Sequence, residues 1–281
     1  MASNYGETLT VGKPGTATYS SITSALNAIP TSGAEAPTFW KRYTIFINPG
    51  TYEEVVSCRP FVNWVGINKS SVLIIAPPSQ SSSTGTIKLD DFVEIQSLTA
   101  VSRPGSTPSQ WVIHANNKSN IGLRNIDVIP QDTTARSGCI KITGGSWTTI
   151  LMEFVGMSYF GETGCALSIS GNASAPQNSD LHLRNMFVDA LKLNVVEAAA
   201  ILLQDCHTSY LSNSLVRVKS PGAGVMIRRT GASGLVNALL EGTSVECVGG
   251  THALDVGSNT TCYFRFSHAD SQLVHPGGEI V

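Results

Sequence analysis

The sequence has little charge of either sign and no long apolar run. Only 14% of its 281 residues are charged, with 18 lysines and arginines against 20 aspartates and glutamates, whereas an average globular domain is about 25% charged. A net charge of -2 provides no basic surface for nucleic acid or an anionic membrane. No apolar run approaches the roughly 18 residues of a membrane-spanning helix. The sequence therefore predicts neither a nucleic-acid partner nor a membrane partner.

The first residues lack the two parts of a secretory signal. Residues 1–15, MASNYGETLTVGKPG, have no basic start and no apolar core, both of which a signal peptide needs. We therefore expect the chain to be made in a cytoplasm. We expect an extracellular location only if the chain is a processed mature form.

Metal-binding patterns are also missing. The six cysteines are widely scattered without a C-x-x-C pair, and the six histidines show no ligand spacing; they are His114, His182, His207, His252, His268 and His275. The pattern predicts no metal and no cofactor, and it favours buried free thiols over a disulfide framework. In GCIKITGG, Ile140 and Ile142 should point inward and Cys139 outward, whereas in GCALSISG we expect Cys165 to point inward, so these two thiols need not stack.

One helix is predicted, near the N-terminus. In residues 20–30, SSITSALNAIP, the apolar residues recur at i, i+3, i+4 and i+7, which marks one face of a helix. Ser20 or Ser21 can cap its start, and Pro30 ends it. The sequence does not decide whether residues 193–203 form a second helix. We expect residues 1–41 to form a strand and a capping helix, continuous in one domain with residues 42–281.

From residue 42 onward, short strands alternate with Gly, Asn and Ser corners. One kind of segment begins at residues 93, 121, 149, 181, 209 and 237, so successive starts differ by 28, 28, 32, 28 and 28 residues. A repeat of this size, with short strands and no helices, predicts a β-solenoid built from parallel-paired rungs. An antiparallel sandwich is less favoured, because hairpin dipeptides such as Asn-Gly are absent between the strands.

Two features of the repeat predict its cross-section. The inward positions should form stacked aliphatic layers; in two repeats they are Ile121, Leu123, Ile126 and Val128, and Leu181, Leu183, Met186 and Val188. Asn125, Asn185 and Asn213 recur at one place in the repeat. We interpret them as an asparagine ladder in which each side chain satisfies a corner backbone group of the next rung.

Residues 8–77 resemble the opening of the pectinesterase family. The resemblance lies in TLTVGKPGTATYSSITSALNAIP, RYTIFINPGTYEEVV and VNWVGINKSSVLII, which match the family's strand, its "I-x-x-A" helix ending in Ile-Pro, and its strand ending "P-G-x-Y-x-E". The match covers about a quarter of the chain, and viral surface proteins that are not esterases share such an opening. The resemblance implies an all-β fold, a single-stranded right-handed parallel β-helix whose N-terminal end is capped by the helix at 20–30.

The family's catalytic motifs are mostly missing. Gln131 and Asp132 in PQDTTARSG match part of the motif that carries the family's first catalytic Asp, but Gln-Asp-Thr after Pro130 is also a natural corner. The second motif corresponds to FVGMSYFG at 154–161, which has no Asp, and nothing matches the motif of the catalytic arginine. Losing one carboxylate of a cooperating pair removes the mechanism. The sequence therefore predicts no catalytic, cofactor-binding or metal-binding residues.

Other candidate residues have structural interpretations. Three sets of acids are interpreted as solvated corners rather than catalysts or calcium ligands: Asp90 with Asp91, Glu53 and Glu54. The aromatics could form sugar-stacking platforms, although such residues more often fill corners or oligomer contacts; they are Trp64, Trp111, Trp147, Tyr159 and Phe160. Arg184, Arg228 and Arg229 are generic candidates for a missing catalytic arginine. An enzyme hypothesis would first test Glu153, Asp189, Asp132 and Arg184.

Three functions are compatible with these features. The favoured hypothesis is a non-catalytic structural β-helix of a virion surface, such as a bacteriophage capsid decoration protein, tail spike or fibre. Such a rod would form a homotrimer and contact other virion proteins, such as a major capsid protein, or glycans. The first alternative is a carbohydrate-active enzyme, an esterase or a depolymerase. The second is a secreted glycan-binding protein, which the missing signal disfavours.

Overall fold

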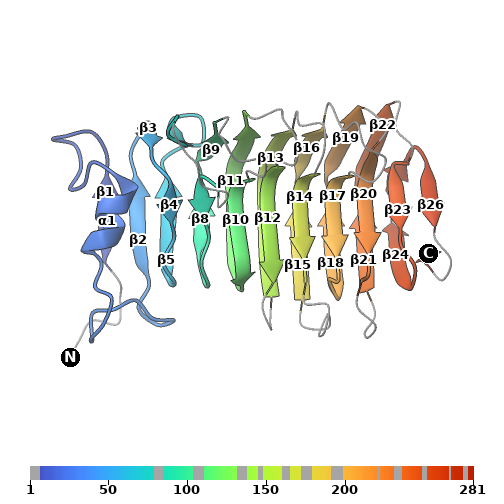
Figure 1. The fold of residues 1–281 in the computed structure, drawn as a ribbon, viewed down its shortest axis with the longest axis horizontal. Helices are drawn as coiled ribbons and strands as arrows, with labels where there is room; N and C mark the ends of the chain where they lie inside the picture. The colour runs from blue at the N-terminus through green and yellow to red at the C-terminus, as the bar shows by residue number, and fades with distance from the viewer. Residues whose placement is uncertain are drawn as a thin grey trace.

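The computed structural model describes residues 7–78, 85–103, 111–131, 138–144, 148–159, 165–171, 179–190, 199–219, 222–230, 236–248, 252–265, 267–274 and 278–281. These residues form an all-β, right-handed parallel β-helix with a single α-helix, α1 (Ile22–Ala28). The strands lie side by side along a rod, with α1 at its N-terminal end (Figure 1). The predicted fold class and capping helix are therefore confirmed.

The first column of strands forms one long side of the rod, and every neighbouring pair in it is parallel. Its strands are β1 (Thr8–Val11), β2 (Tyr43–Ile47), β5 (Val62–Gly66), β8 (Glu94–Gln96), the first halves of β11 (Ile121–Pro130) and β13 (Thr148–Tyr159), β15 (Ser179–Arg184), β18 (Thr208–Ser212), β21 (Val236–Glu241), β24 (Thr260–Arg265) and β27 (Glu279–Ile280).

The second column joins the first, because β11 and β13 run through both. Its other strands are β3 (Gly50–Glu53), β6 (Val72–Ile75), β9 (Thr99–Ser102), β16 (Phe187–Ala190), β19 (Leu215–Lys219), β22 (Ser244–Val248) and β25 (His268–Ala269).

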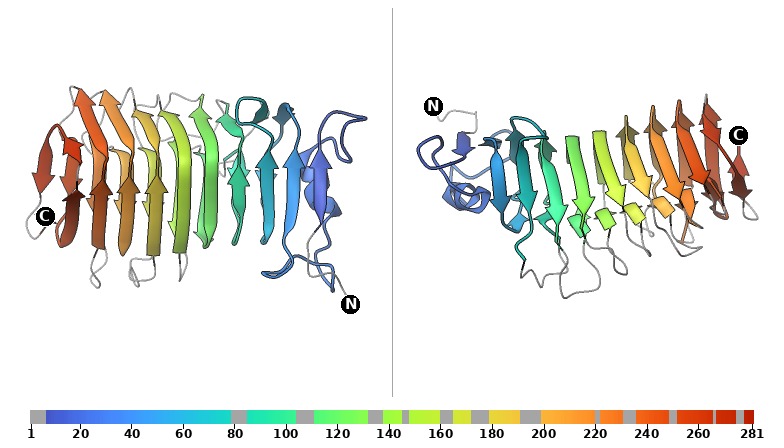
Figure 2. Two further views of the ribbon diagram at one scale, coloured as in Figure 1. Left: turned by 180° about the vertical axis from the view of Figure 1, so that it is seen from behind. Right: turned by 90° about the horizontal axis from the view of Figure 1, so that it is seen from above.

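The third column is a separate sheet. Its strands are β4 (Val56–Ser57), β7 (Ile87–Lys88), β10 (Trp111–Lys118), β12 (Gly138–Gly144), β14 (Cys165–Ser170), β17 (Ala199–Gln204), β20 (Ala223–Arg228), β23 (Leu254–Val256) and β26 (Gln272–Val274). Figure 2 shows the rod from behind and from above, with β1 and the last strands at opposite ends. The sequence left a second helix over 193–203 undecided. The end of this stretch lies in β17, and residues 191–198 are outside the described part.

The core consists of aliphatic stacks that run along the rod. One stack follows the register of the first column and is buried throughout; it contains Ile45, Trp64, Ile95, Leu123, Met152, Leu183, Leu211 and Leu240. All the inward positions predicted in the repeats at 121–128 and 181–188 are buried. The predicted repeat starts need small corrections, because Ile121 pairs with Ile150 and Ser209 with Ala238, so the starts at 149 and 237 are each one residue early.

The helix α1 is tied to the rod at both of its ends. Ser21 caps its start in a capping box with Ser24, and Glu54 accepts hydrogen bonds from the backbone N–H groups of Ile22 (2.8 Å) and Thr23 (2.9 Å). At the other end, Arg59 donates to the carbonyl oxygens of Leu26 and Ile29. Such contacts satisfy the free backbone groups of a helix end. The interpretation of Glu54 as a solvated corner residue was therefore wrong.

The predicted asparagine ladder marks one corner, but its physical basis differs from the prediction. Asn125, Asn185 and Asn213 have φ angles of 49°, 52° and 49°, a left-handed conformation that asparagine tolerates better than most residues. The corner backbone groups are satisfied by backbone bonds, such as Asn213 N–H to the carbonyl of Glu241 (2.9 Å), while the Asn125 side chain donates to Ser97 Oγ (3.2 Å). Asparagine therefore recurs because of the backbone conformation.

Phe154 occupies the same corner in the rung between Asn125 and Asn185. Its φ is 55°, a conformation that costs a bulky residue about 1–2 kcal/mol. Its side chain is 55% exposed, so burial does not offset that cost. Phe154 interrupts the asparagine ladder and places an aromatic ring on the surface.

Cys139 departs from its predicted outward orientation, whereas Cys165 is buried, as expected. Cys139 is fully buried in the main core cluster, whereas Cys165 is 9% exposed and lies outside that cluster. The alternation fails because two consecutive residues, Cys139 and Ile140, are both enclosed where the chain enters the third column; the Cys139 sulfur lies 3.9 Å from the Ser158 carbonyl oxygen of β13. Cys165 pairs with neither Cys139 nor Ile140, because the register places Ile140 opposite Leu167, which confirms that the two thiols do not stack.

Candidate functional site

A groove runs along the outer face of the first column near its C-terminal end. It crosses β15, β18, β21 and β24, whose inward residues belong to the main core cluster or pack against it. The register places His182 beside Tyr210, Tyr210 beside Leu239, and Leu239 beside Tyr263. A hollow of about 680 Å³ lies around Tyr210, Leu239 and Tyr263. A smaller hollow of about 170 Å³ shares Tyr210 and Leu239 with it and is also lined by His182. The groove therefore follows the axis of the rod.

The floor of the groove is aromatic. The rings of His182 and Tyr210 stack with centroids 5.0 Å apart and an interplanar angle of 11°. Tyr210 is 38% exposed and Tyr263 is 43% exposed. Exposed aromatic side chains that follow one line are typical of contact surfaces, because each presents a large, rigid, partly apolar area.

Polar side chains border the aromatic floor. Thr208 and Asn237 lie on one side, and Arg184, Ser212, Glu241 and Arg265 lie on the other. Glu241 pairs with Arg265 at 3.7 Å. Among the described residues, the side chains of Asn237, Tyr210 and Arg184 have no hydrogen-bond or ion-pair partner. The groove thus combines an apolar floor with unused donors and acceptors, the usual composition of a ligand site.

Acidic side chains are scarce in the groove. Among its described lining residues, Glu241 has the single acidic side chain, and it already pairs with Arg265. Hydrolysis of a sugar ester or a glycosidic bond needs two cooperating groups within reach of the bond. The described lining of the groove supplies one acidic side chain for such a reaction.

The structure describes three residues of the enzyme hypothesis, Glu153, Asp189 and Arg184, and of these Arg184 lines the groove. Glu153 on β13 is the register partner of Arg184 on β15, so these two lie on adjacent strands of the first column. Asp189 lies beyond the corner, on β16, between Ser158 and Arg217 in the register. Asp132 lies outside the described residues, while the neighbouring Gln131 donates its backbone N–H to the carbonyl of Ser102.

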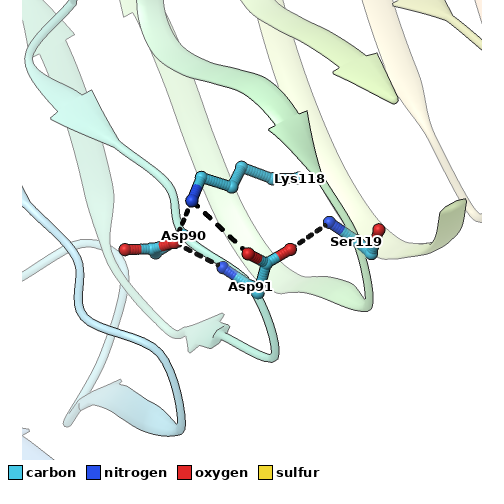
Figure 3. Close-up of polar contacts among 4 residues, drawn as sticks. All are labelled: Asp90, Asp91, Lys118 and Ser119. Atoms are coloured by element: carbon cyan, nitrogen blue, oxygen red, sulfur yellow. Dashed lines mark hydrogen bonds and ion pairs between the residues drawn. The ribbon is translucent and has the colours of Figure 1, made fainter. Parts of the chain in front are cut away.

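Other candidate arginines and acids have structural partners. Arg228 lies 3.6 Å from a carboxylate oxygen of Asp255, on the third column, and Arg229 also has a partner. The close-up in Figure 3 shows Asp90 and Asp91 around the ammonium group of Lys118. Asp91 also accepts the backbone N–H of Ser119 at 2.7 Å (Figure 3). The hydrogen bond to Asp90 raises the pKa of Lys118. Asp90 and Asp91 therefore stabilise a corner of the rod by binding Lys118 and Ser119 of the next rung.

The buried cysteines are poor nucleophiles. Burial raises the pKa of Cys165 to about 11 and that of Cys206 to about 12, so both thiols stay protonated at neutral pH, and the thiolate is the reactive form. No three histidine, cysteine or acidic side chains of the described residues come together as a metal site. Within the same residues, no helix is long and apolar enough to cross a membrane.

Of the aromatics that the sequence suggested as sugar platforms, the three that the structure describes do not line the groove. Trp64 and Tyr159 are fully buried, Trp111 is nearly so, and Trp147 and Phe160 lie outside the described residues. The groove aromatics were missed, because no motif links His182, Tyr210 and Tyr263. Aligning the repeats would have found the first two, since each is the second residue of its segment, in LHL and SYL.

No family model and no curated protein sequence matches the chain. Solved structures of pectin methylesterases match its fold. The enzyme PemA from Erwinia chrysanthemi has a TM-score of 0.52 at 11% identity, covering 98% of this chain and 94% of that one. The carrot enzyme has a TM-score of 0.49 at 10% identity over 97% and 88%, and the Aspergillus niger enzyme 0.48 at 14% over 97% and 83%. At such identities, the PemA likeness defines the class of fold, a pectinesterase-like right-handed parallel β-helix, and no activity.

Proposed function

We propose that this chain is a non-catalytic structural β-helix of a virion surface, either a capsid decoration protein or a tail spike or fibre. The observation that carries the non-catalytic part is the composition of the groove. Its single described acidic side chain, Glu241, is paired with Arg265, while Tyr210, Asn237 and Arg184 keep unused binding groups. The groove is therefore suited to hold a surface ligand without transforming it.

The rod geometry supports a structural role. Stacked rungs that contact only their neighbours, capped by α1, unfold together and are kinetically stable. The low charge of the chain leaves Ser, Thr and Asn as its main polar surface groups. In this proposal the chain is made in the cytoplasm of a host cell and forms a homotrimer through its long faces. The homotrimer attaches to a major capsid protein or a neighbouring virion component, and the groove contacts glycans.

Pectin hydrolysis tests the non-catalytic part of the proposal. Methyl-esterified pectin incubated with the wild-type chain should release no more methanol than a blank without protein, because the described residues of the groove supply one acidic side chain rather than the required pair. The Asp132→Ala variant should give the same background. Methanol release that Asp132→Ala abolishes would overturn the proposal and establish an esterase instead. Release that survives this substitution would also overturn it and place the catalytic carboxylates elsewhere.

A further inference from the structure

Three basic side chains are stacked on the outer face of the third column, away from the groove. Lys88 on β7 is the register partner of His114 on β10, and His114 is the register partner of Lys141 on β12. Neighbouring strands lie about 4.8 Å apart, so the three side chains start within about 10 Å of one another. Like charges at directly adjacent positions of a sheet are destabilising.

The two lysines lack the carboxylate partner that eight other described basic residues have. The described lysines and arginines that pair with a carboxylate are Lys41, Lys69, Arg103, Lys118, Arg124, Arg217, Arg228 and Arg265. Lys88 and Lys141 have no ion pair within the described residues. The acids that follow Lys88 in the chain, Asp90 and Asp91, are bound by Lys118. Lys141 lies over the ring of Trp111 at 5.7 Å, which positions its ammonium group without neutralising it.

His114 has one buried and one accessible ring nitrogen. Nδ1 is buried without a hydrogen-bond partner, whereas Nε2 is not among the buried unpartnered atoms of the described residues and makes no hydrogen bond there. A buried N–H without a partner is costlier than a buried lone pair. The proton of the neutral ring therefore belongs on Nε2, which retains contact with solvent and can donate outward.

We propose that Lys88, His114 and Lys141 bind a small oxyanion group, a sulfate, a phosphate or a carboxylate, on the outer face of the third column. Two ammonium groups and the Nε2–H of His114 supply donors from three consecutive strands, and charge-assisted hydrogen bonds to oxyanions are among the strongest in proteins. The group is either a free ion or a substituent of a larger ligand. This site is separate from the groove and does not depend on its function.

Anion binding at this site is coupled to a proton. Burial lowers the pKa of His114, and the charges of Lys141 and Lys88 lower it further. These lysines, on β12 and β7, are the charged groups that face His114 from the two strands paired with its own. A bound anion offsets their charge and raises this pKa. Protonation of His114 therefore adds affinity for the anion. This added affinity is fully present below the His114 pKa of the anion-free protein, and it is lost as the pH rises through the His114 pKa of the anion-bound protein.

The test follows the histidine ring signals of the ¹⁵N-labelled full chain by NMR during titration with inorganic sulfate. Sulfate keeps its charge across the pH range of histidine titration, and sodium chloride holds the ionic strength constant. We expect a saturable shift of the His114 signals, a raised His114 pKa at saturation and tighter binding at lower pH. The exposed His268 serves as the internal reference. A His114 response no larger than that of His268 would overturn the proposal.

Matched variants separate the site from general electrostatics. Lys88→Gln and Lys141→Gln should each weaken sulfate binding about tenfold, the value of one charge-assisted hydrogen bond. Lys13→Gln removes an exposed lysine without an ion pair among the described residues and should leave binding unchanged. In the absence of sulfate, the Lys88→Gln/Lys141→Gln double variant should also have a raised His114 pKa. This shift shows that the fold persists and that the lysines face the ring.

Two further outcomes decide the proposal and the source of the group. Equal sulfate affinity in the wild type and the double variant would overturn the site. A parallel titration uses dextran sulfate, with unmodified dextran as the control. If dextran sulfate binds far more tightly than inorganic sulfate and dextran does not bind, the group is a substituent of a polymer. Equal affinity per sulfate group would identify a free ion.

Discussion

The Tyr210→Ala/Tyr263→Ala double variant is expected to lose glycan binding by at least about 30-fold, the effect of truncating one strong contact residue of about 2 kcal/mol. The two rings lie on the floor of the groove, two strands apart in the register, and both are exposed. Their removal takes away the apolar area on which sugar rings would pack and leaves the bordering Thr208 and Asn237 in place. Binding is measured on an array of neutral and acidic polysaccharides.

Trp40→Ala is the matched control for the groove. Trp40 is 81% exposed and belongs to the segment between α1 and β2, so its removal deletes an exposed aromatic ring without changing the groove. This variant should bind as the wild type does. Equal loss in the control and the double variant, or a wild-type chain that binds no polysaccharide on the array, would contradict the assignment of the groove.

Trp64→Ala is expected to lower the free energy of unfolding by about 3–5 kcal/mol, the usual cost of removing a large buried aromatic side chain. Trp64 is fully buried on β5, where it separates Ile45 from Ile95 in the core stack. Deleting it leaves a cavity between two rungs that the flanking backbone pairing holds apart. Guanidinium chloride unfolding followed by circular dichroism measures the loss.

The exposed Trp40 again provides the comparison for stability. Trp40→Ala should change the free energy of unfolding by no more than about 0.5 kcal/mol, as is usual at the surface. Similar small losses of unfolding free energy in both variants would show that Trp64 does not form part of the core stack. The register of β2, β5 and β8 would then differ from the one described.

The fold could be predicted because its determinants are local and repeated. The helix at 20–30 has one apolar face and a serine cap, and the inward positions of each rung recur at a nearly constant spacing. The starts at 149 and 237 were one residue early because corners differ in length, and only backbone pairing shows which residues face each other. Cys139 was misassigned for a related reason, since strict alternation fails where the chain enters a new column.

The candidate sites could not be predicted because they depend on neighbours in space. Glu54 follows a Pro-Gly corner in the sequence, and nothing local links it to the N–H of Ile22, 32 positions earlier. His182 and Tyr210 belong to different repeats, as do Lys88, His114 and Lys141, and each is an ordinary outward residue of a short strand. Their significance appears when the rungs are stacked, which places them at adjacent register positions.

The proposed virion role is tested most sharply by locating the chain in virus-producing cells that are made to express it. Intact particles are separated from soluble protein on a density gradient, and an antibody raised against the chain is used for both immunoblotting and immunogold labelling. The account predicts that the chain sediments with intact particles at a fixed ratio to the major capsid protein, and that gold marks the particle surface. A chain that remains in the soluble fractions, with unlabelled particles, would contradict it.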